Sequence, residues 1–105
     1  MSKPSSYYAV IFTSIRTEGE DGYAEMAERM EQLAKQQAGF IGMESARDVL
    51  GITISYWDTL ENIRAWKQQA DHLMAQQFGR EKWYSRYTVR ICKVEHEYAF
   101  PHHEL

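Results

Sequence analysis

The 105-residue sequence predicts an α+β fold, in which four strands and two helices follow the order strand, helix, strand, strand, helix, strand. Apolar residues alternate with a period of two in four short segments, which is typical of strands. In two longer segments they recur with a period of about 3.6, which is typical of amphipathic helices. The turn-rich stretch 17–22 and the glycines at 39 and 79 separate several of these segments.

The first predicted strand is residues 7–14 (YYAVIFTS), which are rich in β-branched and aromatic side chains. Apolar residues occupy both of its faces, whereas an antiparallel sheet with one wet face would carry polar residues on that side. We therefore expect both faces to be covered. A first helix is predicted from Tyr23 to a point before Gly39, because apolar residues recur at helical spacing and a glycine can end the helix.

Residues 40–47 and 50–57 are predicted to form a hairpin that turns at Asp48-Val49. The alternation of apolar residues with a period of two ends at Trp57, and helical spacing begins after it. Asp58 and Glu61 can form a capping box, which predicts a second helix from Thr59 to about Phe78 with a bend near 68–71. The helix places Trp66 close to Trp57, so two indoles are expected to define any pocket between sheet and helix.

The chain ends with a predicted helical turn at 81–84 and one long strand from Arg86 to about Phe100. The element order is that of the split βαβ, ferredoxin-like arrangement, a four-stranded antiparallel sheet with both helices on one face. The last strand outruns its neighbours, and a strand of this kind needs pairing from elsewhere. Together with the second apolar face of the first strand, it predicts a C2 homodimer.

Length and composition predict one domain, residues 1–105, with loosely ordered tails at 1–6 and 101–105. A net charge of −3 argues against nucleic acid as a partner. No apolar run approaches the roughly 20 residues that span a bilayer, and the N-terminus lacks a secretory signal pattern. The single cysteine, Cys92, excludes an internal disulfide framework and favours a cytoplasmic location.

Several short motifs then resemble a known family. They are Gly39-Phe40-Ile41-Gly42, Glu44-Ser45, Ile54-Ser55-Tyr56-Trp57, Ile63, Trp66-Lys67, His72, Gly79-Arg80, Trp83-Tyr84 and Arg90. In this order and spacing they resemble the antibiotic biosynthesis monooxygenase domain over nearly the whole chain, residues 7–98. The resemblance implies a dimeric α+β barrel, in which two ferredoxin-like sheets pack face to face.

The resemblance implies one of two activities. One type of member oxidises aromatic polyketides or quinols with molecular oxygen and no metal or flavin, and Trp57 matches a tryptophan of that type. The other type degrades haem, with a tryptophan matched by Trp66 and a ligating histidine ten residues on. The same type carries an asparagine on the first strand. Here the tenth residue after Trp66 is Gln76, and the first predicted strand, residues 7–14, contains no asparagine. Both departures argue against haem degradation.

The candidate catalytic residues are His72 as general base and Asn62 or Arg90 as the group that holds an oxyanion. The expected substrate is an apolar hydroxy-aromatic, quinol or polyketide-like molecule, with molecular oxygen as co-substrate. Residues expected to line its pocket are Trp57, Trp66, Trp83, Tyr84, Met26 and Met30. No set of cysteines, histidines or carboxylates has the spacing of a metal site.

Each candidate also has a structural explanation. The tryptophans and methionines can be core residues, Asn62 a surface residue, and His72 a half-exposed histidine bonded to backbone. An inward-facing arginine among Arg47, Arg86 and Arg90 would stabilise an oxyanion, although pairing with Glu44 or Glu95 is commoner. Because no two groups form a dependable catalytic constellation, the alternative function is a binding or sensing module for a small hydrophobic metabolite.

Overall fold

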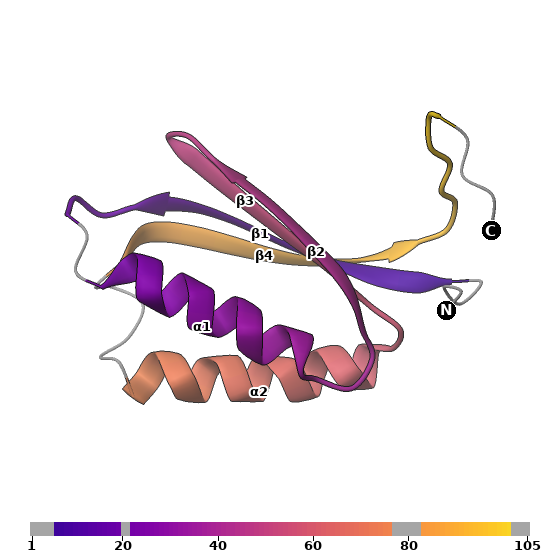
Figure 1. The fold of residues 1–105 in the computed structure, drawn as a ribbon, viewed down its shortest axis with the longest axis horizontal. Helices are drawn as coiled ribbons and strands as arrows, with labels where there is room; N and C mark the ends of the chain where they lie inside the picture. The colour runs from indigo at the N-terminus through magenta and orange to yellow at the C-terminus, as the bar shows by residue number, and fades with distance from the viewer. Residues whose placement is uncertain (1–5, 20–21, 77–82, 102–105) are drawn as a thin grey trace.

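The computed structural model describes residues 6–19, 22–76 and 83–101, which form one antiparallel sheet and two helices (Figure 1). The elements are β1 (Tyr7–Arg16), α1 (Tyr23–Lys35), β2 (Phe40–Arg47), β3 (Leu50–Trp57), α2 (Leu60–Gln76) and β4 (Tyr84–Val94). This order confirms the predicted ferredoxin-like arrangement and the hairpin at Asp48-Val49.

The sheet has the strand order β2-β3-β1-β4, and both helices lie on one of its faces (Figure 1). Tyr8 is the register partner of Trp57, and Phe12 is the partner of Val89. Because paired residues of neighbouring strands point to the same face, the register identifies which side chains of β3 and β4 face the helices.

Two apolar clusters join the helices to the sheet. In the first, Ala34 of α1 and Ile63 of α2 pack with Trp57, and all three are buried. The second joins α1, α2 and the start of β4, and its buried members are Met26, Leu73, Met74 and Trp83. Met26, Ala34 and Ile63 therefore lie in the core, as their helical spacing predicts, whereas Leu60 at the start of α2 is 43% exposed.

The other face of the sheet carries apolar side chains without any helix over it. Ala9 and Ile11 of β1 lie there beside Ile54 and Ile52 of β3, and Ile52 is 39% exposed. Both faces of β1 are thus apolar, as the sequence indicates, and only one is covered by the helices of the same chain. We call the uncovered side the open face.

The structure corrects the prediction of a bend in the second helix. Helix α2 is continuous from Leu60 to Gln76, since Leu73 and Met74 pack in the core and Lys67 pairs with Asp71 at 2.7 Å across one turn. Its cap also differs from the prediction. The hydroxyl of Thr59, not the Asp58 carboxylate, accepts the bond from the backbone amide of Asn62 at 3.1 Å.

The prediction for the C-terminal strand is wrong at both ends. β4 begins at Tyr84, so this residue belongs to a strand and not to a helical turn, while 77–82 lie outside the described residues. The strand ends at Val94, the register partner of Tyr7, because β1 begins there and offers no residue further along for pairing. Residues 95–99 continue without regular secondary structure.

Candidate active site

Two stacked indoles connect β3 to α2. The rings of Trp57 and Trp66 lie 5.9 Å apart and 21° from parallel. Trp57 is fully buried, its Nε1 donates to the Ser55 hydroxyl at 2.9 Å, and the Phe40 ring meets it edge-on at 5.5 Å. Trp66 is only half-buried, so this indole is the one that can meet a ligand.

Asn62 lies one helical turn before Trp66, and Asp58 fixes its orientation. The Asn62 Nδ2 donates to Asp58 Oδ1 at 2.8 Å, and the backbone amide of Asp58 donates to the carbonyl of Gly39 at 3.0 Å. A carboxylate only accepts hydrogen bonds, so the amide nitrogen of Asn62 must face it. Among the residues that the structure describes, none bonds to the second Nδ2 hydrogen or the Oδ1 of Asn62, so both can meet a ligand.

The helix-facing side chains of β1 and β4 continue the site beyond the indole stack. We define the apolar shelf as Val10, Phe12, Tyr87, Val89 and Ile91. Val10 lies opposite Ile91, and Phe12 lies opposite Val89. The β4 members are 38% to 49% exposed although they point toward the helices. The helices therefore leave this part of the sheet accessible to an apolar ligand.

A basic and aromatic cluster lies at the far end of the shelf. The guanidinium carbon of Arg16 lies 3.6 Å from the centroid of the Tyr23 ring, and that of Arg47 lies 5.9 Å from it. Burial, and then a hydrogen bond with Tyr23, raise the pKa of Tyr84 well above its ordinary value, although both arginines act to lower it. The ring centroids of Phe12 and Tyr84 lie 5.3 Å apart, so Phe12 joins this cluster to the shelf.

Four of the predicted site residues lie along the indole stack and the apolar shelf, whereas His72 does not. Trp57, Trp66 and Asn62 lie together at the start of α2, and Tyr84 lies at the far end of the shelf. His72 is exposed while its neighbours Leu73 and Met74 are buried, so it faces away from the sheet.

The remaining predicted residues lie in other places. Arg90 is the partner of Ile11 and lies on the open face. Trp83 is 2% exposed in the core with Met26, and Met30 packs against the same cluster. These three side chains are therefore core, and Arg90 cannot reach the shelf.

The sequence did not predict a role for Arg16. Its signal was its place in the alternation of β1, in which Tyr8, Val10, Phe12 and Ser14 precede it on the helix-facing side. Arg47 was one of three arginines that the sequence could not orient. The register places it, unlike Arg86 and Arg90, on the helix-facing side, opposite Gly51.

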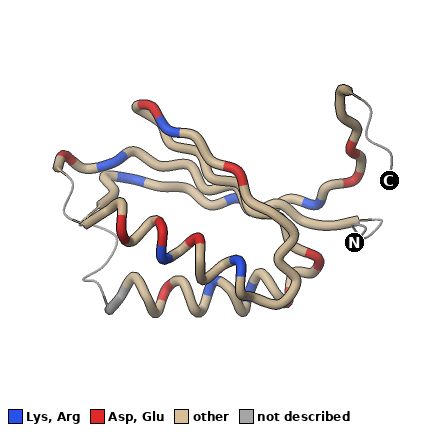
Figure 2. Tube along the Cα trace, viewed as in Figure 1, with Lys and Arg blue, Asp and Glu red and all other residues tan. Residues whose placement is uncertain are grey.

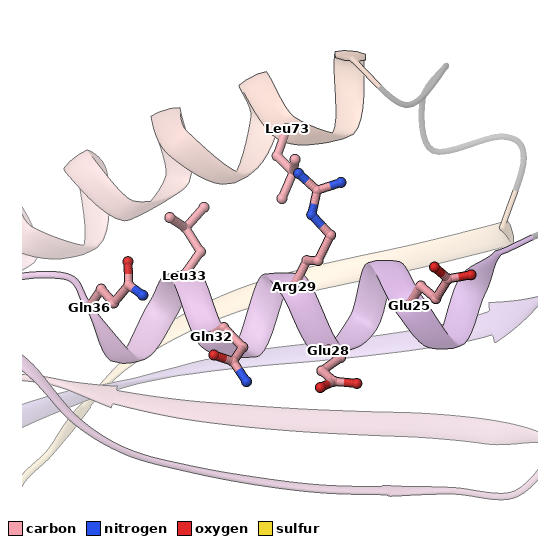
Figure 3. Close-up of a pocket in the computed structure, with 7 residues that line it drawn as sticks. All are labelled: Glu25, Glu28, Arg29, Gln32, Leu33, Gln36 and Leu73. Atoms are coloured by element: carbon pink, nitrogen blue, oxygen red, sulfur yellow. The ribbon is translucent and has the colours of Figure 1, made fainter.

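Two hollows lie outside this site. A groove of about 540 Å³ runs between the helices, where Leu33 and Arg29 of α1 point toward Leu73 of α2 (Figure 3). The remaining side chains around it are polar: Glu25, Glu28, Gln32 and Gln36. A second hollow, of about 690 Å³, lies on the open face beside Tyr7 and Tyr56. Neither includes a member of the apolar shelf.

The described residues contain neither a cluster of metal ligands nor a membrane-spanning helix. There, no three histidines, cysteines or carboxylates lie close enough to hold a metal ion. In the same part of the chain, no helix is long and apolar enough to cross a membrane.

Comparison with known proteins gives the family and the fold. Residues 6–77 match the family described as antibiotic biosynthesis monooxygenase. The uncharacterized protein YqjZ of Bacillus subtilis is 48% identical over 96 residues, which cover 90% of this chain and 84% of YqjZ.

Solved structures with low sequence identity share the fold. SnoaB of Streptomyces nogalater, described as a cofactor-independent oxygenase, has a TM-score of 0.61 at 13% identity, covering 91% of this chain and 97% of SnoaB. Protein SO0527 of Shewanella oneidensis has a TM-score of 0.68 at 9% identity, covering 89% of this chain and 95% of that one. At such identities the likeness extends to the fold alone.

Proposed function

The chain belongs to the antibiotic biosynthesis monooxygenase family, and from this premise we propose that it oxidises an apolar aromatic substrate with molecular oxygen, without a bound metal or flavin. The observation that carries the proposal is the half-buried indole of Trp66, stacked on the buried Trp57 beside an accessible apolar shelf. A flat aromatic molecule can lie against both surfaces. The description of SnoaB as a cofactor-independent oxygenase also supports it.

The proposed reaction converts an activated CH₂ group of a hydroxy-aromatic substrate into a carbonyl. The substrate loses a proton to water, and its anion gives electrons to oxygen. One oxygen atom enters the substrate, and the other leaves as water with the two hydrogens of the CH₂ group. In this proposal the second Nδ2 hydrogen of Asn62, the one that Asp58 does not accept, donates to the oxyanion, and the indole of Trp66 holds the ring.

Oxygen consumption with a panel of quinols, anthrones and other hydroxy-aromatics tests this proposal. Asn62→Ala should lower kcat by about 100-fold, since an oxyanion donor acts mainly in the transition state. His72→Ala is the matched control on the same helix and should leave turnover unchanged, because its side chain faces away from the sheet. Full activity of N62A, or loss of activity in H72A, would contradict this assignment.

One observation favours a second function, a binding module without chemistry. Within the described residues, the apolar shelf offers no side chain that could serve as a base, and the carboxylate of Asp58, beside the indole stack, is already hydrogen-bonded to Asn62. Such a module would bind hydroxy-aromatics, as measured by quenching of tryptophan fluorescence, and would consume no oxygen with any of them. Haem degradation ranks third, and a haem titration without a shifted Soret band would remove it.

We also propose that a second copy of the chain covers the open face. Ile52 and Leu50 are 39% and 46% exposed there, and the tail beyond β4 exposes Tyr98 and Phe100 almost fully. Burial of these apolar side chains would stabilise a homodimer. Sedimentation at micromolar concentration should give twice the chain mass, and Ile52→Glu should give a monomer; a monomeric wild type would contradict the proposal.

A cytoplasmic location stays a prediction.

A further inference from the structure

We propose that Arg16 and Arg47 form an anion-binding subsite, so that the substrate is an aromatic anion such as a hydroxy-aromatic carboxylate. The inference rests on the proposed function, because the subsite lies at the end of the same apolar shelf. It adds the charge of the substrate and the direction in which the molecule lies.

The two guanidiniums come from different strands and meet at one aromatic ring. Arg47, the last residue of β2, reaches over Gly51 of β3 and donates to the carbonyl of Ser14 on β1 at 3.2 Å, and to its hydroxyl. Arg16, at the end of β1, lies over the Tyr23 ring. Since Ser14 is the register partner of the shelf residue Tyr87, the arginines lie where the shelf ends.

Both arginines retain donors that the described chain does not use. Arg16 donates to the carbonyls of Trp83 and Gly19, each at 3.0 Å, and Arg47 donates to two acceptors of Ser14. A guanidinium carries five N–H groups, so three on each arginine remain for a ligand. Carboxylates are well suited to them, because they accept two parallel N–H bonds.

No carboxylate among the described residues neutralises this pair. The ion pairs found there join Lys35 to Glu31 and Lys67 to Asp71, both on helices. Figure 2 shows blue basic positions on the strands above the start of α1, with red acidic positions at the ends of those strands and both colours along α1. Two like charges beside aromatic rings repel one another, and a bound anion would offset that cost.

The spacing between the indole stack and the arginines limits the size of the ligand. Val10, which packs against the Trp57 cluster, is four residues from Ser14 along β1. At about 3.3 Å per residue, the two positions are roughly 13 Å apart. A two- or three-ring aromatic acid fits this span, with its rings on the shelf and its carboxylate at the arginines.

Binding to the full chain, measured by calorimetry at low salt, tests the subsite with two probes. 3-Hydroxy-2-naphthoate should bind at least about tenfold more tightly than 2-naphthol, which has the same rings and hydroxyl but no carboxylate. Arg47→Met should remove this preference and leave the affinity for 2-naphthol unchanged. Arg86→Met is the control, because Arg86 is a β4 arginine on the open face and its loss should change neither affinity.

Equal affinity of the wild-type chain for the two probes would overturn the inference, as would an equal loss of preference in R47M and R86M. Equal affinity would indicate that the chain's own carboxylates already neutralise the arginines. The wild-type comparison needs no variant, so it remains decisive if R47M unfolds. Selective binding of the naphthoate, with no oxygen uptake on any member of the quinol and anthrone panel, would support the subsite and contradict the monooxygenase; oxygen uptake on that panel with equal affinity for the two probes would do the reverse.

Discussion

The guanidinium of Arg47 lies directly over the backbone of Gly51, in space that any side chain at Gly51 would occupy. The arginine thereby crosses a whole strand and satisfies the hydroxyl and carbonyl of Ser14, a residue that is 1% exposed. Gly51 is buried and does not have a left-handed backbone, so its value lies in the absence of a Cβ.

Gly51→Ala should displace the Arg47 side chain, since the new methyl group would overlap its guanidinium. The buried polar groups of Ser14 would lose their partner, and we expect the free energy of unfolding to fall by about 1–3 kcal/mol in urea titrations. Gly42→Ala is the control in the adjacent strand, because its added Cβ would find Tyr56 at an ordinary 4.0 Å. Similar losses in both variants would show that the overlap at Gly51 is unimportant.

Gly39→Ala should be considerably more destabilising than Gly22→Ala, although both glycines have φ near +80°. A Cβ at Gly22 would meet nothing within 4 Å, so only the backbone strain of about 1 kcal/mol applies. At Gly39 it would overlap Asp58 and Asn62, and we expect a total of about 3 kcal/mol or more. Thermal unfolding of the two variants measures the difference; equal midpoints would refute the steric part.

The two stacked tryptophans should respond differently to replacement by phenylalanine. Trp57→Phe should cost about 2 kcal/mol of unfolding free energy, because it leaves a cavity and removes the bond to Ser55. Trp66→Phe should cost less, since Trp66 is half-buried, and should weaken the binding of 2-naphthol. Urea titrations and calorimetry of both variants test the contrast. Stronger destabilisation by W66F would contradict it.

Stability should decrease in alkaline solution in part through two phenols on the open face, in addition to Tyr84. Burial and a hydrogen bond to Glu97 raise the pKa of Tyr7 to about 12, and a bond to Glu44, at 2.7 Å, with burial raises the pKa of Tyr56 to about 12. In the unfolded chain both tyrosines titrate at about pH 10. The folded state therefore holds more protons between these values, and its stability falls as pH rises from 10 to 12.

Urea titrations of the wild type and of Tyr56→Phe at pH 8 to 11.5 test this pH dependence. The variant lacks one of the two phenols, so its stability should fall less steeply above pH 10. Glu28→Gln, on the exposed surface of α1, should follow the wild type. Identical slopes for wild type and Y56F would contradict a raised pKa at Tyr56.

Much of the fold could be predicted because each element shows its period in the sequence. The alternation in 50–57 and the helical spacing of Ile63 and Trp66 were enough to bring Trp57 and Trp66 together. The end of β4 was not predictable in the same way. Residues 95–99 contain no glycine or proline that would end the strand, but a strand requires a partner, and the position where β1 starts decides whether one exists.

The candidate site was only partly predictable because orientation depends on register. His72 follows from the sequence as a polar residue near the apolar stripe of α2, yet the unbroken helix turns it to solvent. Arg47, Arg86 and Arg90 are alike in sequence, and only strand pairing shows that one of them shares a face with Ser14. The contact of Arg47 with Ser14 runs from β2 across β3 to β1, and a local sequence pattern cannot predict a contact between strands that are not neighbours.

The exposure of Val89 and Ile91 on β4 has a consequence for how this protein can diverge. These side chains lie against the proposed ligand position but outside the buried clusters that hold the helices to the sheet. Exchanges at these two positions should therefore change which molecule is accepted while leaving the fold nearly as stable. New specificities could accumulate on this strand by single substitutions, with no compensating change in the interior.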